Sequence, residues 1–141
     1  MKPSNARNVM VCSLNRATCH RLVQAGNDIA EESGLPLTVL SIQPQGLVSS
    51  TVAQNIQVLH NITSRAGAEA NILFSDSPAL TLAVHAKQTN AAHILIDRAD
   101  FSGNFFLKTI VELLPEVTVS VLEQDGRIIT FSPANDTMSV Y

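Results

Sequence analysis

The sequence predicts an α/β fold with an open, parallel five-stranded sheet in the Rossmann-like order 3-2-1-4-5. Helices are expected on both faces, and an antiparallel sixth strand is expected at one edge. Two observations support this prediction. Short apolar segments alternate with amphipathic segments of about ten or more residues, which are long enough to be crossover helices between parallel strands. A single Asp-Gly pair near the C-terminus is typical of a hairpin turn.

The expected strands are short apolar runs rich in β-forming residues. They comprise residues 9–12, 37–42, 71–74, 94–96, 117–122 and about 127–132. Asp125 and Gly126 separate the last two runs, so the final strand is expected to return antiparallel to the one before it. Residues 133–141 are polar and are expected to be a loose tail.

Four helices are expected between the strands, because apolar residues recur there at the spacing of one helix face. The first follows the turn at residues 13–15, with its apolar stripe over residues 19–33, and the others span residues 49–66, 79–88 and about 104–114. Start and stop signals bound these segments. Gly67 ends the second helix, Pro78 lies near the first turn of the third, and Pro115 follows the fourth.

The length and composition are those of one globular domain over residues 1–141. Hydrophobic residues make up 45% and charged residues 15%, which excludes a disordered chain. No apolar run approaches the roughly 20 residues of a membrane span, and the polar N-terminus does not resemble a signal peptide. A cytoplasmic location is therefore expected. The net charge of −3, with scattered lysines and arginines, argues against nucleic-acid binding.

The polar loop after residues 94–96 is the candidate ligand site. In an open α/β sheet, ligands bind where the carboxyl ends of strands meet the N-termini of helices. The candidate ligand-binding residues around this position are Ser13, Asn15, Asp97, Arg98, Asp100, Ser102, Gly103 and Asn104. Two of them are aspartates, where a phosphate cradle would need glycine.

Three passages carry a family resemblance. Residues 74–80 read Phe-Ser-Asp-Ser-Pro-Ala-Leu, residues 91–96 read Ala-Ala-His-Ile-Leu-Ile, and Val11-Cys12 is followed by Arg-Leu-Val at residues 21–23. The first two resemble the Gly-Asp-Pro-Ala and Gly-Ala-Asp-Leu-Ile-Val passages of the universal stress protein family. The third is similar to the stress-protein-like module of osmosensing potassium-operon histidine kinases. The resemblance implies a domain core within residues 8–122 and a cytoplasmic regulatory or binding module of the stress response.

Nucleotide-binding members of that family carry Gly-x2-Gly-x9-Gly-Ser/Thr after the fourth strand. The matching positions here are Asp97, Asp100, Ile110 and Val111. Each carboxylate would repel a phosphate oxygen at about 4 Å by about 1–4 kcal/mol. The turn at residues 13–15 also lacks the acid usual in those members. The resemblance therefore implies the branch that does not bind ATP and needs no cofactor. The alternative is an adenine-nucleotide binder with an altered phosphate loop.

No arrangement of residues predicts catalysis. Cys19 and His20 are adjacent on a helix, where side chains point about 100° apart, so the pair is not a metal site. Asp97 and Asp100 could hold Mg²⁺ in a hydrolase or phosphoryl-transfer enzyme, and this alternative stays open. The simpler interpretation is that Asp100 or Ser102 caps the following helix. We therefore expect neither an enzyme nor a metal site.

The C-terminal hairpin suggests an interface. The fifth strand commonly forms the dimer contact in the universal stress protein family, and the hairpin should cover that edge here. Its own strand carries apolar residues on both faces, which is unusual for a solvated edge. We expect a homodimer whose interface residues are Val119, Val121, Ile128, Ile129 and Phe131. A signalling protein is the second kind of partner expected.

Overall fold

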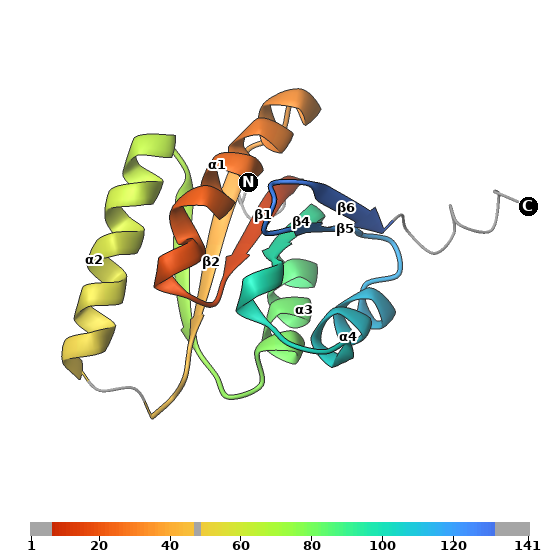
Figure 1. Ribbon diagram of the computed structural model, residues 1–141. Helices are drawn as coiled ribbons and strands as arrows, with labels where there is room; N and C mark the ends of the chain where they lie inside the picture. The colour runs from red at the N-terminus through yellow and green to blue at the C-terminus, as the bar shows by residue number, and fades with distance from the viewer. Residues whose placement is uncertain (1–6, 47–48, 132–141) are drawn as a thin grey trace, which may run out of the picture.

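The structure is a computed structural model that describes residues 7–46 and 49–131. The predicted tail and residue 132 lie outside the described residues. Strands and α-helices alternate along the chain (Figure 1). The elements are β1 (Asn8–Ser13), α1 (Arg16–Ser33), β2 (Leu37–Gln43), α2 (Ser49–Ala66), β3 (Glu69–Phe74), α3 (Pro78–Gln88), β4 (Ala91–Asp97), η2 (Arg98–Asp100), α4 (Phe105–Leu113), β5 (Thr118–Leu122) and β6 (Ile128–Phe131).

The strands form one sheet in the order β3-β2-β1-β4-β5-β6. All neighbouring pairs are parallel except β5 and β6, which are antiparallel. The predicted fold class is confirmed, including the antiparallel strand at the edge. Along the chain, strands are added on one side of the sheet from β1 to β3 and on the other side from β4 to β6. The order of addition reverses between β1 and β4, so these two strands form the switch point of the sheet.

Each face of the sheet is covered by two helices (Figure 1). Side chains of a strand alternate between faces, and β1 shows this alternation clearly. Val9 and Val11 belong to the core beneath α1 and α2, whereas Met10 and Cys12 belong to the core beneath α3 and α4. The two cores are separated only by the sheet, which is why the central strands are apolar on both faces.

Helix α1 packs very closely on β1. A Cβ atom at Gly26 would overlap the Cγ2 atom of Val11 and would lie 3.3 Å from the Cδ1 atom of Leu37. Glycine at this position therefore lets the helix backbone approach the sheet. Helix α1 starts at Arg16, directly after the turn predicted at residues 13–15, and the Asn15 side chain caps it by accepting a hydrogen bond from the backbone N–H of Ala17 at 2.9 Å.

Two strands begin earlier than their apolar runs predict. Strand β3 begins at Glu69, which pairs with Thr38, and β4 begins at Ala91, which pairs with Asn8. Backbone pairing with a neighbouring strand is independent of side-chain hydropathy, so it extends both strands beyond their apolar runs. Among the described residues, no helix is both long and apolar enough to span a membrane.

Candidate functional site

Asp97 ends β4 and is completely buried, with 0% of its surface exposed. Its carboxylate is held by Arg21 of α1 through two hydrogen bonds, Nε to Oδ2 and Nη2 to Oδ1, each 2.8 Å long. Oδ1 also accepts a hydrogen bond from the backbone N–H of Ala99 at 2.9 Å. The buried charge of Asp97 is therefore compensated by a bidentate ion pair with Arg21. A ligand could reach Asp97 only if this ion pair were broken.

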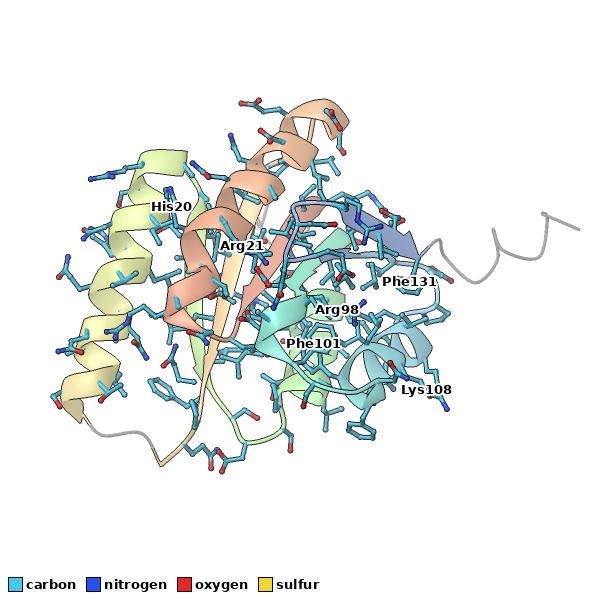
Figure 2. The ribbon with its side chains drawn as sticks, viewed as in Figure 1. His20, Arg21, Arg98, Phe101, Lys108 and Phe131 are labelled. Atoms are coloured by element: carbon cyan, nitrogen blue, oxygen red, sulfur yellow. The ribbon has the colours of Figure 1, made fainter. Side chains whose placement is uncertain are left out.

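Arg21 also contacts the turn between β5 and β6. Its Nη1 atom donates to the backbone carbonyl oxygens of Glu123 at 3.3 Å and Gln124 at 3.4 Å. Arg98 pairs with the Glu123 carboxylate at 3.0 Å, and its guanidinium lies 5.3 Å from the ring centre of Phe101 (Figure 2). The two arginines thus connect α1, the loop after β4 and the hairpin turn.

Asp100 lies against the start of α1. Its Oδ2 atom accepts a hydrogen bond from the backbone N–H of Leu14 at 3.1 Å, and its Oδ1 atom accepts one from the Thr18 hydroxyl at 2.7 Å. Burial raises the pKa of Asp100, and the nearby charge of Asp97 adds to the rise, while the two hydrogen bonds oppose it. A helix N-terminus attracts anions, so the chain's own carboxylate occupies the place that a ligand anion would take.

This contact corrects the sequence-based interpretation of Asp100 and Ser102 as caps of the following helix. The N-cap residue of α4 is Asn104, whose side chain makes no capping hydrogen bond. Asp100 contacts the start of α1 instead. The prediction considered only local sequence, whereas the partners of Asp100 are 82 and 86 positions away.

Ser13 and Asn15 lie in the turn between β1 and α1. The Ser13 hydroxyl donates to the backbone carbonyl of Asn15 at 3.4 Å, and the Asn15 side chain caps α1. The cavity beside them measures only about 10 Å³, about the volume that one water needs. The side chain of Gln43 joins Ser41 and Asn55 there through hydrogen bonds of 2.7 Å. The sequence did not predict this chain of polar side chains, because Gln43 of β2 and Asn55 of α2 meet only when the helix packs on the sheet.

The remaining candidate ligand-binding residues have different surroundings. Ser102, Gly103 and Asn104 are exposed, and Gly103 has the left-handed φ of 69° that favours glycine. Ser102 and Asp100 line a cavity of about 480 Å³ between the N-termini of α3 and α4. The structure therefore brings Asp100 and Ser102 to one cavity, while Asp97 and Arg98 are engaged in ion pairs.

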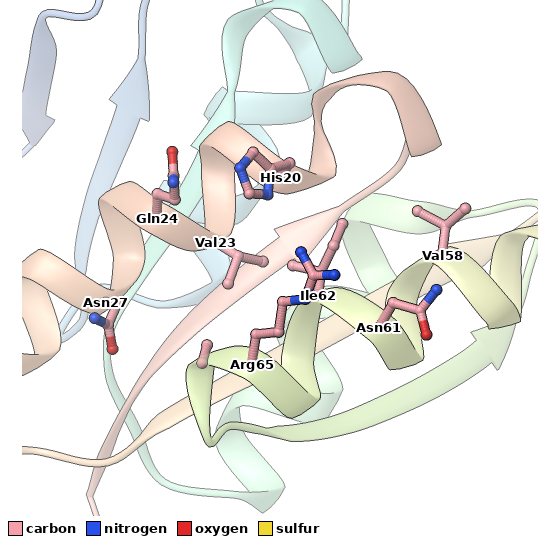
Figure 3. A pocket seen from close by; sticks show the side chains of 9 residues that line it. His20, Val23, Gln24, Asn27, Val58, Asn61, Ile62 and Arg65 are labelled. Atoms are coloured by element: carbon pink, nitrogen blue, oxygen red, sulfur yellow. The ribbon is translucent and has the colours of Figure 1, made fainter.

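A second cavity of about 480 Å³ lies between α1 and α2. Residues of both helices line this groove, among them His20 and Val23 of α1 and Asn61, Ile62 and Arg65 of α2 (Figure 3). His20 and Arg21 leave α1 on different sides, His20 toward α2 and Arg21 toward the loop after β4 (Figure 2). The groove was not predicted, because it depends on how two helices distant in sequence pack together.

Nothing in the described part of the chain indicates metal chemistry. No group of three or more His, Cys, Asp or Glu side chains in residues 7–46 and 49–131 could hold a metal ion. Cys12 and Cys19 are both buried free thiols, and burial raises the pKa of each. A raised pKa keeps a thiol protonated and unreactive.

The predicted interface residues divide into two groups. Val119 and Val121 are buried inside the chain itself, with exposed fractions of 1% and 0%. Ile128, Ile129 and Phe131 on β6 are 41%, 37% and 36% exposed (Phe131 in Figure 2). Only the β6 residues offer surface to a partner.

No family model matches the chain, and none of the curated proteins matches it. Solved structures do. A universal stress protein family member from Burkholderia pseudomallei is 13% identical over 87% of this chain and 98% of its own, with a TM-score of 0.59. A universal stress protein from Archaeoglobus fulgidus in complex with dAMP is 16% identical over 84% and 98%, with a TM-score of 0.61. A universal stress protein in complex with cAMP is 16% identical over 87% and 99%, with a TM-score of 0.57. The chain thus has the fold of universal stress proteins.

Proposed function

We propose that this chain is a universal-stress-protein-like regulatory or binding module of the cytoplasm that does not bind ATP through the loop after β4. One observation carries the proposal. The Asp100 carboxylate occupies the start of α1, where it accepts hydrogen bonds from the Leu14 N–H and the Thr18 hydroxyl. Since the carboxylate is internal, this anion position needs no external ligand.

The energetics support this proposal. A phosphate at the start of α1 would have to displace Asp100 from two hydrogen bonds, each contributing about 1.5–3 kcal/mol because one partner is charged. Moving Asp100 aside would leave Asp97 nearby, held by Arg21. The small polar cavity at Ser13 and Gln43 offers little room for a base on the other side of the turn. Adenine-nucleotide binding would therefore need both regions to rearrange.

The alternative is an adenine-nucleotide binder with an altered loop. It is favoured by the structural neighbours that were solved with dAMP and with cAMP. Calorimetry and thermal unfolding with ATP, dAMP and cAMP, each with and without Mg²⁺, distinguish the two functions. The Archaeoglobus fulgidus protein serves as the positive control for dAMP.

We expect no binding heat and no change in melting temperature with millimolar nucleotide. A ligand at 100 times its dissociation constant would add about 2.7 kcal/mol, which raises the melting temperature of a domain of this size by several degrees. Such a rise with ATP would overturn the proposal. The same samples test for enzyme activity, and we expect no release of phosphate from ATP.

We further propose that the module acts as a homodimer, with a signalling protein as its downstream partner. The backbone N–H of Glu123 donates to the carbonyl of Arg127 at 2.8 Å, so the backbone groups of Arg127 face β5. Because antiparallel residues alternate, the backbone groups of Ile128 and Thr130 face the free edge of the sheet. Two copies of β6 related by a two-fold axis could pair through these groups, which would place Ile129 opposite its own copy.

A further inference from the structure

The cavity between the N-termini of α3 and α4 is mainly apolar. Leu14 comes from the turn after β1, Leu80 from α3, and Phe101, Phe105 and Phe106 from the loop after β4 and the start of α4. The rings of Phe101 and Phe106 are in contact, with centres 5.1 Å apart. At about 480 Å³ the cavity is within the range of about 300–1,000 Å³ that small-molecule sites occupy.

Two large apolar side chains of this cavity are unusually exposed. Phe105 is 79% exposed and Leu80 is 54% exposed. They lie at the starts of two different helices that the fold brings to the same opening, beside the switch point between β1 and β4. Exposed apolar clusters of this kind mark binding sites, and a switch point is where ligands bind in open α/β sheets.

The charged residues lining the cavity are all acidic. Asp76 and Asp100 line it, and no lysine, arginine or histidine of the described residues does. Arg98, which contacts the Phe101 ring, is already paired with Glu123. The N-termini of α3 and α4 and the start of α1, against which Asp100 lies, each contribute about half a positive charge, which leaves about half a negative charge from the two carboxylates.

Both carboxylates can accept further hydrogen bonds. The Oδ1 atom of Asp76 accepts one from the backbone N–H of Gln45 at 3.1 Å, and each oxygen of Asp100 accepts one. An ionised carboxylate has about four acceptor positions, so each has capacity for a donor on a ligand. Aromatic rings around the carboxylates add an attraction for cations.

We propose that this cavity binds a small organic cation with an apolar or aromatic body, such as an alkyl- or aryl-ammonium compound. Its ammonium group would lie between Asp76 and Asp100, and its body would pack against Phe101, Phe105 and Phe106. The inference rests on the proposed function, because it assigns a cation to the edge of the sheet at which nucleotides are not bound.

The test uses three probes of similar size on the full chain: 2-phenylethylamine, 2-phenylethanol and 3-phenylpropionate. Calorimetry and NMR titration at neutral pH are expected to show binding in the order amine, alcohol, acid, with the amine at least about fivefold tighter than the alcohol. Asp76→Asn is expected to remove this preference, and Phe105→Ala to weaken amine and alcohol together. Glu112→Gln, an acid of α4 that does not line the cavity, is the matched control and should change nothing.

Thermal unfolding verifies that each variant is folded. Because Phe105 is exposed, Phe105→Ala is expected to fold normally. Three results would overturn the inference: equal binding of all three probes, tighter binding of the acid, or no binding of the amine at about 10 mM. A dissociation constant above about 10 mM is too weak for a specific site. None of these results bears on the proposed function, which fails only if nucleotides bind.

Discussion

The Thr18 hydroxyl donates a hydrogen bond of 2.7 Å to Asp100 and thereby ties the loop after β4 to the first turn of α1. The same carboxylate accepts the backbone N–H of Leu14. Because the pKa of Asp100 is raised by burial, folding favours the protonated form of this group. Its contribution to stability is therefore fully present below the ordinary pKa of 3.8 and is lost as the pH rises through the raised value.

Asp100→Asn tests this pH dependence. The amide can still accept from Leu14 and donate to Thr18, but it does not ionise. We expect the native protein to lose stability relative to the variant as the pH rises from about 4, and the difference to become constant at higher pH. Urea unfolding of both proteins between pH 4 and pH 8 measures it. A difference that stays flat, or that changes in the opposite direction, would contradict the prediction.

Arg21→Ala is expected to destabilise the fold strongly, because it leaves the buried carboxylate of Asp97 without its partner. Breaking a buried ion pair costs about 3–5 kcal/mol, and we expect the lower end because the Arg21 side chain is 36% exposed. The double substitution Arg21→Met with Asp97→Asn leaves no unpaired charge and should recover part of the loss. Urea unfolding gives the free energies. A loss below about 1 kcal/mol for Arg21→Ala would place the pair among ordinary surface ion pairs.

Gly26→Ala should destabilise the protein even though alanine favours helices by about 1 kcal/mol over glycine. The added methyl group would overlap Val11, and overpacking of this kind costs about 1–3 kcal/mol. Gln24→Ala, at an exposed position of the same helix, is the control and should change stability by less than about 0.5 kcal/mol. The result to look for in thermal unfolding is a lower melting temperature for Gly26→Ala alone. An increase would show that α1 can move away from β1 at little cost.

Ile129→Lys tests the proposed homodimer. A two-fold pairing of β6 would bring two copies of this side chain together, so two lysines would repel each other and separate the subunits. Leu113→Lys on α4 is the matched control, since Leu113 and Ile129 are both 37% exposed. Light scattering is expected to show a dimer for the native chain and for the control, and a monomer for Ile129→Lys. A native monomer, or a dimer that survives Ile129→Lys, would rule out this interface.

The order of elements was predictable because each helix and strand carries its own periodic pattern and its own start and stop residues. The ends of β3 and β4 were not, since Glu69 and Ala91 join the sheet through backbone pairing that no local pattern encodes. That the candidate loop follows β4 at the carboxyl edge of the sheet was predictable, because this position follows from topology alone.

The roles of the two aspartates in that loop were not predictable from local sequence. Asp97 directly follows the apolar run Ile-Leu-Ile, and an acid at the end of a buried strand does signal that a cation must lie nearby. Nothing in the sequence identifies that cation as Arg21. The cavity rimmed by Leu80 and Phe105 was missed for a similar reason, since its walls come from three segments that are far apart in the sequence.

The contacts of Arg21 have a consequence for the order in which the protein folds during synthesis. Its partners lie 76, 102 and 103 positions later in the chain, so they leave the ribosome long after α1 is complete. The contacts close large loops and are expected to form after the main folding barrier has been crossed. Substitutions at Arg21 should therefore accelerate unfolding more than they slow folding, and the native lifetime of the protein would depend on this side chain.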